Sequence, residues 1–237
     1  MILAIDCGNT RVKWGLRDAG APRWYALGAV LLAEVAQLAQ AWSALPAPSR
    51  IVIANVAGVK MKQALAGTLE RFAIEPEWIA ARACQCGVTN GYVEPGQLGP
   101  DRWAALIGAW HLERRACLVV NAGTATTADM LASDGTFRGG IIIPGVDAMK
   151  RALASSTAGL ALADGHITDA PRCTADAIET GCLHAQAGAI ERMYAKLEAG
   201  AVCVISGGGA QRILPFLNIP VRAVDNLALE GLVRIAA

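Results

Sequence analysis

The chain of 237 residues is long enough for one large domain or two small ones, and with 54% apolar and 17% charged residues it has the composition of a folded globular protein. Its formal net charge of +1 gives no indication of a nucleic acid or an anionic membrane surface as partner. No apolar run reaches the ~18–20 residues that span a bilayer. Asp6 interrupts the N-terminal apolar stretch where a signal peptide would continue. We therefore expect a cytoplasmic protein without nucleic-acid or membrane partners.

The cysteines and histidines show no spacing typical of a metal site. There are seven cysteines, an odd number, and the closest pair, Cys84 and Cys86, is separated by one residue rather than by the two of common zinc and redox motifs. The histidines at positions 111, 166 and 184 are isolated from one another. We expect reduced thiols that behave as small apolar side chains.

In the first half of the chain, predicted strands alternate with predicted helices. Apolar segments bounded by turn residues predict strands at residues 1–7, 11–16, 23–27, 50–55 and 76–80. Helical spacing of apolar residues predicts helices at residues 31–41, 59–72 and 101–115. Between the last strand and the last helix, a polar, glycine-rich stretch from Gly87 to Pro100 is a candidate functional loop.

The second half repeats this order. Strands are predicted at residues 117–120, 126–131, 137–143, 201–205 and 220–224. Helices are predicted after Gly145, at residues 175–198, after Gly209 and at residues 227–235, with a polar linker before residue 172. Three strands, a helix and then alternating strands and helices thus occur twice, which predicts an α/β fold of two subdomains, residues 1–115 and 116–237.

Two glycine-containing turns occupy the same place in each half. In the first, Asp6 ends a strand and is followed by Gly8, Thr10 and Lys13; in the second, Asn121 precedes Gly123 and Thr124. Backbone N–H groups, a hydroxyl and a nearby lysine are groups that hold phosphate oxygens, and Asp6 could hold a hydrated Mg²⁺ ion. The alternative is a pair of ordinary hairpin turns. Their recurrence favours a nucleotide bound by loops from both halves.

Two further segments have both a structural and a functional interpretation. Ser206 and the three glycines after it separate a strand from a helix, which is typical of an anion site but also of a simple glycine turn. Asp101 lies at the start of a helix, where it could serve as the N-cap or could accept a proton from a substrate hydroxyl. The neighbouring Arg102 could neutralise a carboxylate or a phosphate. Both alternatives stay open for both segments.

Taken in order, these motifs resemble those of one family, the type III pantothenate kinases. The matching positions run over nearly the whole chain: residues 6–10, Tyr92, residues 99–102, 123–125, 139–145, 179–181 and 207–208. The Gly-x-Asp-Arg pattern at residues 99–102, between two phosphate loops, is specific. The chain is also similar to the wider superfamily of acetate and sugar kinases, Hsp70 and actin. That similarity implies an α/β fold of two duplicated ribonuclease-H-like subdomains.

The resemblance implies a role for individual residues. ATP phosphates would be bound by Asp6, Cys7, Gly8, Asn9, Thr10, Arg11, Val12 and Lys13, with Thr124 as a contact from the second loop. The pantothenate pocket would be lined by Tyr92, Gly99, Pro100, Asp101, Arg102 and Thr180. Asp101 would be the general base in the transfer of a phosphoryl group from ATP to pantothenate, the first step of coenzyme A biosynthesis.

The family also implies ATP with Mg²⁺, a homodimer and a monovalent cation, K⁺ or NH₄⁺. Most members carry Asp where this chain has Asn121, and an amide lacks the charge of that carboxylate. We therefore expect weak cation dependence, unless Asp129 on the next strand compensates. Two other functions remain as alternatives: a nucleotide-binding regulatory or accessory factor without turnover, and a kinase of another small hydroxylated metabolite.

Overall fold

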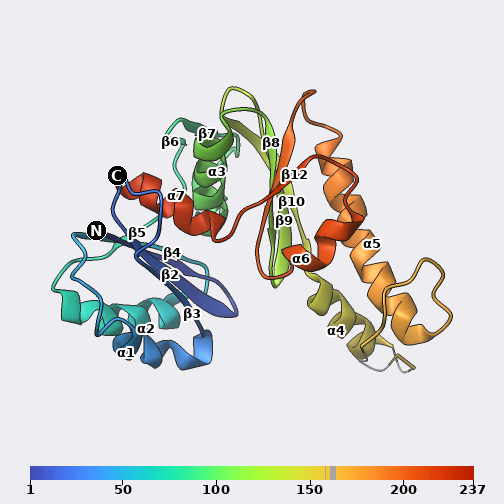
Figure 1. The fold of residues 1–237 in the computed structure, drawn as a ribbon, viewed down its shortest axis with the longest axis horizontal. Coiled ribbons are helices and arrows are strands. Elements are labelled where there is room, and N and C mark those ends of the chain that lie inside the picture. Colours follow the sequence, from blue (N-terminus) through green and yellow to red (C-terminus); the bar gives the residue numbers. More distant parts are fainter. Residues whose placement is uncertain (158, 161–163) are drawn as a thin grey trace. The chain divides into compact units, whose positions relative to one another are not determined.

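The structure, a computed structural model, describes residues 1–157, 159–160 and 164–237 (Figure 1). The chain forms two compact units. Unit 1 consists of Met1–Arg114, Gly135–Phe137 and Asn226–Ala237, and unit 2 consists of Arg115–Asp134 and Arg138–Asp225. This division differs from a single boundary after residue 115, because the C-terminal segment returns to pack within unit 1.

Unit 1 contains a five-stranded sheet in the order β3-β2-β1-β4-β5. Its strands are β1 (Ile2–Cys7), β2 (Arg11–Arg17), β3 (Ala26–Leu31), β4 (Arg50–Asn55) and β5 (Glu77–Trp78). The first three pair antiparallel, whereas β4 pairs parallel with β1 and β5 parallel with β4. The apolar alternation of these strands produces a core that includes Leu3, Ile5 and Trp14.

The helices of unit 1 cover both faces of this sheet (Figure 1). They are η1 (Leu32–Gln37), α1 (Leu38–Ala41), α2 (Val59–Leu69), η2 (Glu70–Phe72), η3 (Pro95–Gln97), α3 (Pro100–Glu113) and α7 (Leu227–Ala236), where η marks a 3₁₀ helix. Leu38, Leu65 and Leu69 from α1 and α2 pack into the core with β1. On the other side of the sheet, α7 contacts β1 and β4.

Unit 2 repeats the topology. Its strands are β8 (Cys117–Ala122), β9 (Ala125–Leu131), β10 (Thr136–Pro144), β11 (Val202–Ser206) and β12 (Val221–Ala223). Their order, β10-β9-β8-β11-β12, matches β3-β2-β1-β4-β5 element by element, including the antiparallel hairpin beside a parallel pair. The predicted duplicated α/β fold is confirmed.

Helices cover one face of the unit 2 sheet: α4 (Val146–Ser156), α5 (Thr174–Tyr194), α6 (Ala210–Ile213) and η4 (Leu214–Phe216). The predicted loop between Gly87 and Pro100 holds regular structure. Its strand β7 (Val88–Asn90) pairs antiparallel with β6 (Cys84–Gln85) and parallel with Thr136 and Phe137, the residues of β10 that belong to unit 1.

The third strand lies further along the chain than its predicted range of residues 23–27. Gly28, just after that predicted range, lies inside β3 opposite Trp14. An ideal Cβ at Gly28 would lie 2.6 Å from the Trp14 ring, so the glycine makes room for the indole. The strand therefore continues to Leu31 because a glycine here serves packing across the hairpin.

α3 and α7 pack at very short range within unit 1. An ideal Cβ at Gly231 would overlap the backbone oxygen of Ala104, and one at Gly108 would lie 2.7 Å from the backbone oxygen of Leu227. A second contact fixes α7 to the sheet: Arg17 Nη1 donates to both carboxylate oxygens of Glu230, at 3.0 and 2.8 Å. These contacts hold the helix that carries Asp101 and Arg102.

None of the helices within the described residues has both the length and the apolar character required to cross a membrane. All seven cysteines are free thiols, and four of them, Cys7, Cys117, Cys182 and Cys203, are buried. No group of three or more potential metal-binding side chains occurs in the described part of the chain.

Candidate active site

The first hairpin loop (residues 8–11) connects β1 and β2. The Gly8 N–H donates to the Arg11 carbonyl at 3.1 Å, and Asn9, Thr10 and Arg11 are exposed. Asp6 pairs with Lys13 on the neighbouring strand, so a carboxylate and an ammonium group flank the loop. An ideal Cβ at Gly8 would make only ordinary contact with the Arg11 oxygen, at 3.6 Å. The protein's own packing thus gives no reason for a glycine at this position.

Cys7 lies between Asp6 and Gly8 and is fully buried. Burial, reinforced by the charge of Asp6, raises the pKa of the Cys7 thiol to about 12. The side chain therefore stays a neutral thiol and packs in the core rather than reacting. Of the residues predicted to bind ATP, Cys7 and the buried Val12 can contribute only backbone groups.

The second hairpin loop (residues 123–125) has the same position in unit 2. It connects β8 and β9, the Gly123 N–H donates to the Ala125 carbonyl at 3.0 Å, and its three residues are exposed. An ideal Cβ at Gly123 would again make only ordinary contact, at 3.5 Å. Each unit thus presents a solvent-exposed glycine turn at the equivalent hairpin.

Asp6 and Asp101 come together in unit 1 although they are far apart in the sequence. The residue after β4, Val56, donates its N–H to the carbonyl of Cys7 at 3.0 Å, and its side chain lies beside Gly99. The start of α3 is thereby placed next to the end of β1. Burial and then the negative charge of Asp101 raise the pKa of Asp6 to about 6, against the opposing effect of Lys13.

Two neighbouring carboxylates fit a bound divalent cation. Mg²⁺ usually takes one or two protein carboxylates and fills its remaining positions with water and substrate phosphates. A cation here would remove the repulsion that raises the Asp6 pKa. The Asp6 carboxylate, with the negative charge of Asp101 beside it, therefore agrees with the chemistry of a magnesium nucleotide.

Asp101 is not the helix cap. Helix α3 begins at Pro100, its N-cap is Gly99, and no side chain caps it. Asp101 is instead the second helical residue, with its Oδ1 2.6 Å from an ideal Cβ at Gly99. The capping alternative was wrong because Pro100 shifts the first helical position forward, and a proline at this position needs no N–H partner.

Arg102 and Phe137, both buried, form a cluster with the half-buried Tyr92 in unit 1. Arg102 Nη1 donates to the Tyr92 hydroxyl at 3.1 Å, and its guanidinium carbon lies 5.7 and 6.0 Å from the centroids of the Tyr92 and Phe137 rings. The two rings lie 5.2 Å apart. No pattern in the sequence points to Phe137, because its approach to Tyr92 depends on the pairing of β10 with β7.

Asn90 sets the position of Tyr92. Its side-chain oxygen accepts the Tyr92 N–H at 3.0 Å, and its side-chain nitrogen donates to the Pro95 carbonyl at 3.2 Å. Asn90 is 8% exposed. An asparagine that bonds the backbone two residues on forms an Asx turn, and its occurrence in a polar loop was the signal available in the sequence.

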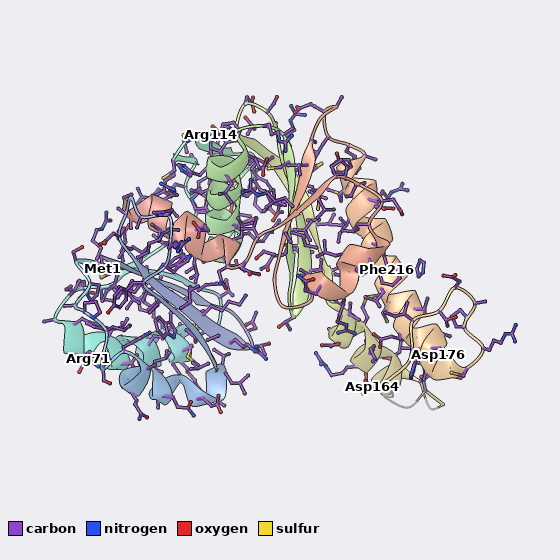
Figure 2. All side chains as sticks on the ribbon, in the orientation of Figure 1. Met1, Arg71, Arg114, Asp164, Asp176 and Phe216 are labelled. Atoms are coloured by element: carbon purple, nitrogen blue, oxygen red, sulfur yellow. The ribbon has the colours of Figure 1, made fainter. Side chains whose placement is uncertain are left out.

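Thr180 lies in unit 2, near the start of α5, and is buried. Its Oγ1 accepts the Thr168 N–H at 3.3 Å. The carboxylate of the preceding residue, Glu179, accepts hydrogen bonds from Lys150 Nζ at 2.5 Å and from Arg212 Nη2 at 2.8 Å. Asp164, labelled in Figure 2, also lies 3.4 Å from Lys150 Nζ. These ion pairs join α4, α5 and α6 around Thr180.

The charges in this cluster keep Glu179 ionised. Burial alone would raise the pKa of Glu179, but the hydrogen bonds and charges of Lys150 and Arg212 outweigh it and lower the pKa. Lys150 and Arg212 could not be predicted as partners of Glu179, because no local spacing in the sequence connects them to it. Breaking a buried ion pair leaves an uncompensated charge, so these partners stabilise the local structure only together.

Asn121 and Asp129 share one face of the unit 2 sheet. Asn121 pairs with Thr127 and Val119 pairs with Asp129, so the two side chains are diagonal neighbours on adjacent strands. Asp129 is buried, and its Oδ1 lies where a Cβ on Gly140 would be. Alternation alone could not give the direction of the Asp129 side chain.

The glycines after Ser206 have a structural reason. Gly207 has φ +101° and packs on the backbone of Ala122, where a Cβ would overlap the Ala122 oxygen. Gly209 donates its N–H to the same oxygen at 2.9 Å. The helix that follows, α6, has four residues, too few for a substantial helix dipole. The structure favours the interpretation as a glycine turn.

The pKa of Asp6 predicts that Asp6→Asn stabilises the ligand-free protein at neutral pH. A carboxyl whose pKa is raised on folding opposes folding once it ionises, so its contribution falls as the pH rises from about 4 to about 6. In urea unfolding at pH 8, we expect the variant to be about 1–3 kcal/mol more stable than the wild type. The difference should vanish near pH 4.

Asp147→Asn is the matched control with the opposite sign. The hydrogen bond from Arg212 lowers the pKa of Asp147, which therefore stabilises the fold above its unfolded pKa and loses that effect as the pH falls. We expect this variant to be less stable than the wild type at pH 8. A loss of stability at pH 8 in Asp6→Asn as well would contradict the raised pKa.

The sequence has close relatives with a common description. A profile of the family described as "Type III pantothenate kinase" matches residues 2–196. A type III pantothenate kinase from Aromatoleum aromaticum is 54% identical over 238 residues, covering 100% of this chain and 98% of the relative. Another, from Azoarcus sp. strain BH72, is 51% identical over 239 residues, covering 100% and 91%.

Solved structures share the fold at low sequence identity. A protein from Campylobacter jejuni described as a Baf family transcriptional activator aligns with a TM-score of 0.64 at 20% identity, over 98% of this chain and 96% of the other. The ethanolamine utilization protein EutJ from Carboxydothermus hydrogenoformans aligns with a TM-score of 0.57 at 12% identity, over 99% and 88%. These similarities concern the fold alone. The family is given by the sequence: the chain belongs to the type III pantothenate kinases.

Proposed function

We propose that this protein transfers the γ-phosphoryl group of ATP to the hydroxyl of pantothenate, giving ADP and 4′-phosphopantothenate. Its family phosphorylates pantothenate in coenzyme A biosynthesis. The observation that carries the proposal is the placement of the Asp101 carboxylate in the first turn of α3, beside Asp6 and free of any capping role. A carboxylate so placed is available to a substrate proton.

Asp101 is the general base of the proposed reaction. It accepts the proton of the pantothenate hydroxyl while that oxygen forms a bond to the γ-phosphorus. The bond between the γ-phosphorus and the bridging oxygen of ADP breaks, and ADP leaves with the electron pair. The protein does little covalent chemistry in such a transfer, so positioning and charge neutralisation dominate.

Arg102 and Tyr92 serve the acceptor in this proposal. The hydrogen bond from Arg102 to Tyr92 and the stack with Phe137 hold the guanidinium in one orientation, ready for a carboxylate or the transferring phosphoryl group. Gly99 and Pro100 place the start of α3 beside them. The family resemblance also assigns Thr180 to pantothenate binding, and within unit 2 its Oγ1 accepts the Thr168 N–H.

The first hairpin loop binds ATP phosphates through backbone N–H groups, the Thr10 hydroxyl and Lys13. The family resemblance also assigns Thr124, in the second hairpin loop, to ATP binding. Asp6 would hold Mg²⁺ at this site. When bound, Mg²⁺ neutralises charge on the β- and γ-phosphates. The exposure of both loops and the proximity of Asp6 to Asp101 support this assignment.

ADP release with and without pantothenate tests the function directly. We expect ADP to accumulate only when pantothenate is present. Nucleotide binding without turnover would favour a regulatory or accessory factor instead. Turnover with a different hydroxylated acceptor, and none with pantothenate, would favour another small-molecule kinase.

Asp101→Asn should lower turnover by about 10²–10⁴-fold, because the amide cannot accept the proton. The melting temperature should not fall, since the N-cap of α3 is Gly99 and the repulsion with Asp6 is removed. Steady-state kinetics and thermal unfolding check both points. Glu75→Gln, at an exposed carboxylate of unit 1, is the control and should keep full activity. Near-full activity of Asp101→Asn would remove Asp101 from the chemistry.

Asn121 predicts a weak response to potassium or ammonium. A neutral amide keeps an oxygen ligand but loses the Coulomb attraction of a carboxylate, and Asp129 lies at a diagonal position rather than directly opposite. We expect turnover in sodium or Tris buffer to be within about twofold of that in potassium. Asn121→Asp should increase the dependence. Strong potassium activation of the wild type would contradict this account of Asn121.

A homodimer in the cytoplasm completes the proposal, and it is supported by the resemblance to the family. Light scattering at assay concentrations should give twice the mass of the 24.6 kDa chain. A monomer with full activity would contradict the dimer.

A further inference from the structure

Gln186 is a polar side chain buried in an apolar core. It is 0% exposed and lies in the middle of α5, between Leu183 and Ile190, which are both part of the unit 2 core. Residues three and four apart share a helix face, so Gln186 lies on the stripe that α5 packs against the sheet. Burying an amide among apolar side chains is unfavourable unless it forms a hydrogen bond, so the Gln186 amide needs a partner.

The partner is the peptide between Pro144 and Gly145. Gln186 Nε2 donates to the Pro144 carbonyl at 2.7 Å and lies 3.2 Å from Met149 Sδ in α4. The N–H of the same peptide, on Gly145, donates to the carbonyl of Thr124 at 3.0 Å. One peptide unit therefore connects the Gln186 amide to the second hairpin loop.

This connection is tightly packed. A Cβ at Gly145 would overlap the Gly123 oxygen and lie 2.9 Å from the Thr124 oxygen. The carbonyl groups of Gly123 and Thr124 are thus directed against Gly145. A rotation of the Pro144–Gly145 peptide would displace the loop, since a hydrogen bond and close packing join them.

We propose that Gln186 is a positioning residue for nucleotide binding: it fixes the Pro144–Gly145 peptide and so the backbone of the second hairpin loop. The inference rests on the proposed contact of Thr124 with ATP. Gln186 itself touches no substrate. It acts indirectly, because its hydrogen bond holds the peptide whose Gly145 N–H bonds to the loop.

The unpaired end of the amide supports a functional rather than a stabilising role. Gln186 Oε1 is buried and has no hydrogen-bond partner among the described residues. Leaving an acceptor unpaired inside a protein is unfavourable, and an apolar side chain of equal size would avoid it. The orientation of the amide is set by Pro144, because only the nitrogen can donate to its carbonyl. The donor is retained although its oxygen is unsatisfied.

Gln186→Met tests the inference, since methionine has nearly the same size and no donor. We expect the KM for ATP to rise about three- to tenfold, the effect of one lost hydrogen bond, while the KM for pantothenate and kcat stay within about twofold. The melting temperature should change little, because the variant removes the unpaired oxygen together with the donor. Calorimetric titration of ADP should show the same weakening without turnover.

Two further variants separate the possible failures. Ile190→Val, one turn along the same buried face, is the control for core packing and should leave both KM values unchanged. Thr124→Ala tests the proposed ATP contact itself.

If Thr124→Ala weakens ATP binding but Gln186→Met does not, the inference is overturned and the proposed function stands. If Thr124→Ala has no effect, the assignment of Thr124 fails, and the inference fails with it. Equal rises of both KM values in Gln186→Met, accompanied by a lower melting temperature, would show a purely structural role and overturn the inference.

Discussion

Unit 1 depends on the close contact between α3 and α7. Two glycines, Gly108 and Gly231, let the helix backbones approach to distances at which a single Cβ would overlap a carbonyl oxygen. The contact brings the last segment of the chain onto β1 and β4 and fixes α3, with Asp101 and Arg102 in its first turn. Small residues at a helix crossing thus determine where the proposed base lies, because interior packing leaves no room for adjustment.

This position of α3 produces repulsion between the carboxylates of Asp101 and Asp6, at the end of β1. Asp6 is partly buried and lies close enough to Asp101 for its pKa to be raised to about 6. A cation bound at the proposed nucleotide site would remove this repulsion.

Helix α5 carries the proposed site residue of unit 2, as α3 carries those of unit 1. Near its start, Glu179 is held by Lys150 and Arg212, and Thr180 follows it. Two turns further on, Gln186 reaches the peptide that supports the second hairpin loop. One rigid element thus connects a proposed acceptor residue and a proposed nucleotide loop, which places both on a scaffold more precise than a loop.

The sequence by itself determined the two hairpins, the duplicated order of strands and helices, and the segment of residues 99–102. These features depend on local patterns: alternation, turn residues and the position of a proline. The local pattern left the role of Asp101 open between helix cap and base. The structure excludes the cap, because α3 begins at Pro100 and its N-cap is Gly99. The packing of α7 within unit 1 could not be predicted from the sequence, because a helical pattern does not indicate which surface the helix will cover.

Only the tertiary structure decided the contacts that support the site. Glu179 bonds to Lys150 and Arg212 across 29 and 33 residues, and Gln186 reaches Pro144 across 42. Phe137 joins Tyr92 only through the pairing of β10 with β7. Such partners lie on different elements, and their approach is set by how whole faces pack rather than by spacing along the chain. Local patterns therefore specified the two hairpin loops and the start of α3, and packing specified which side chains hold them.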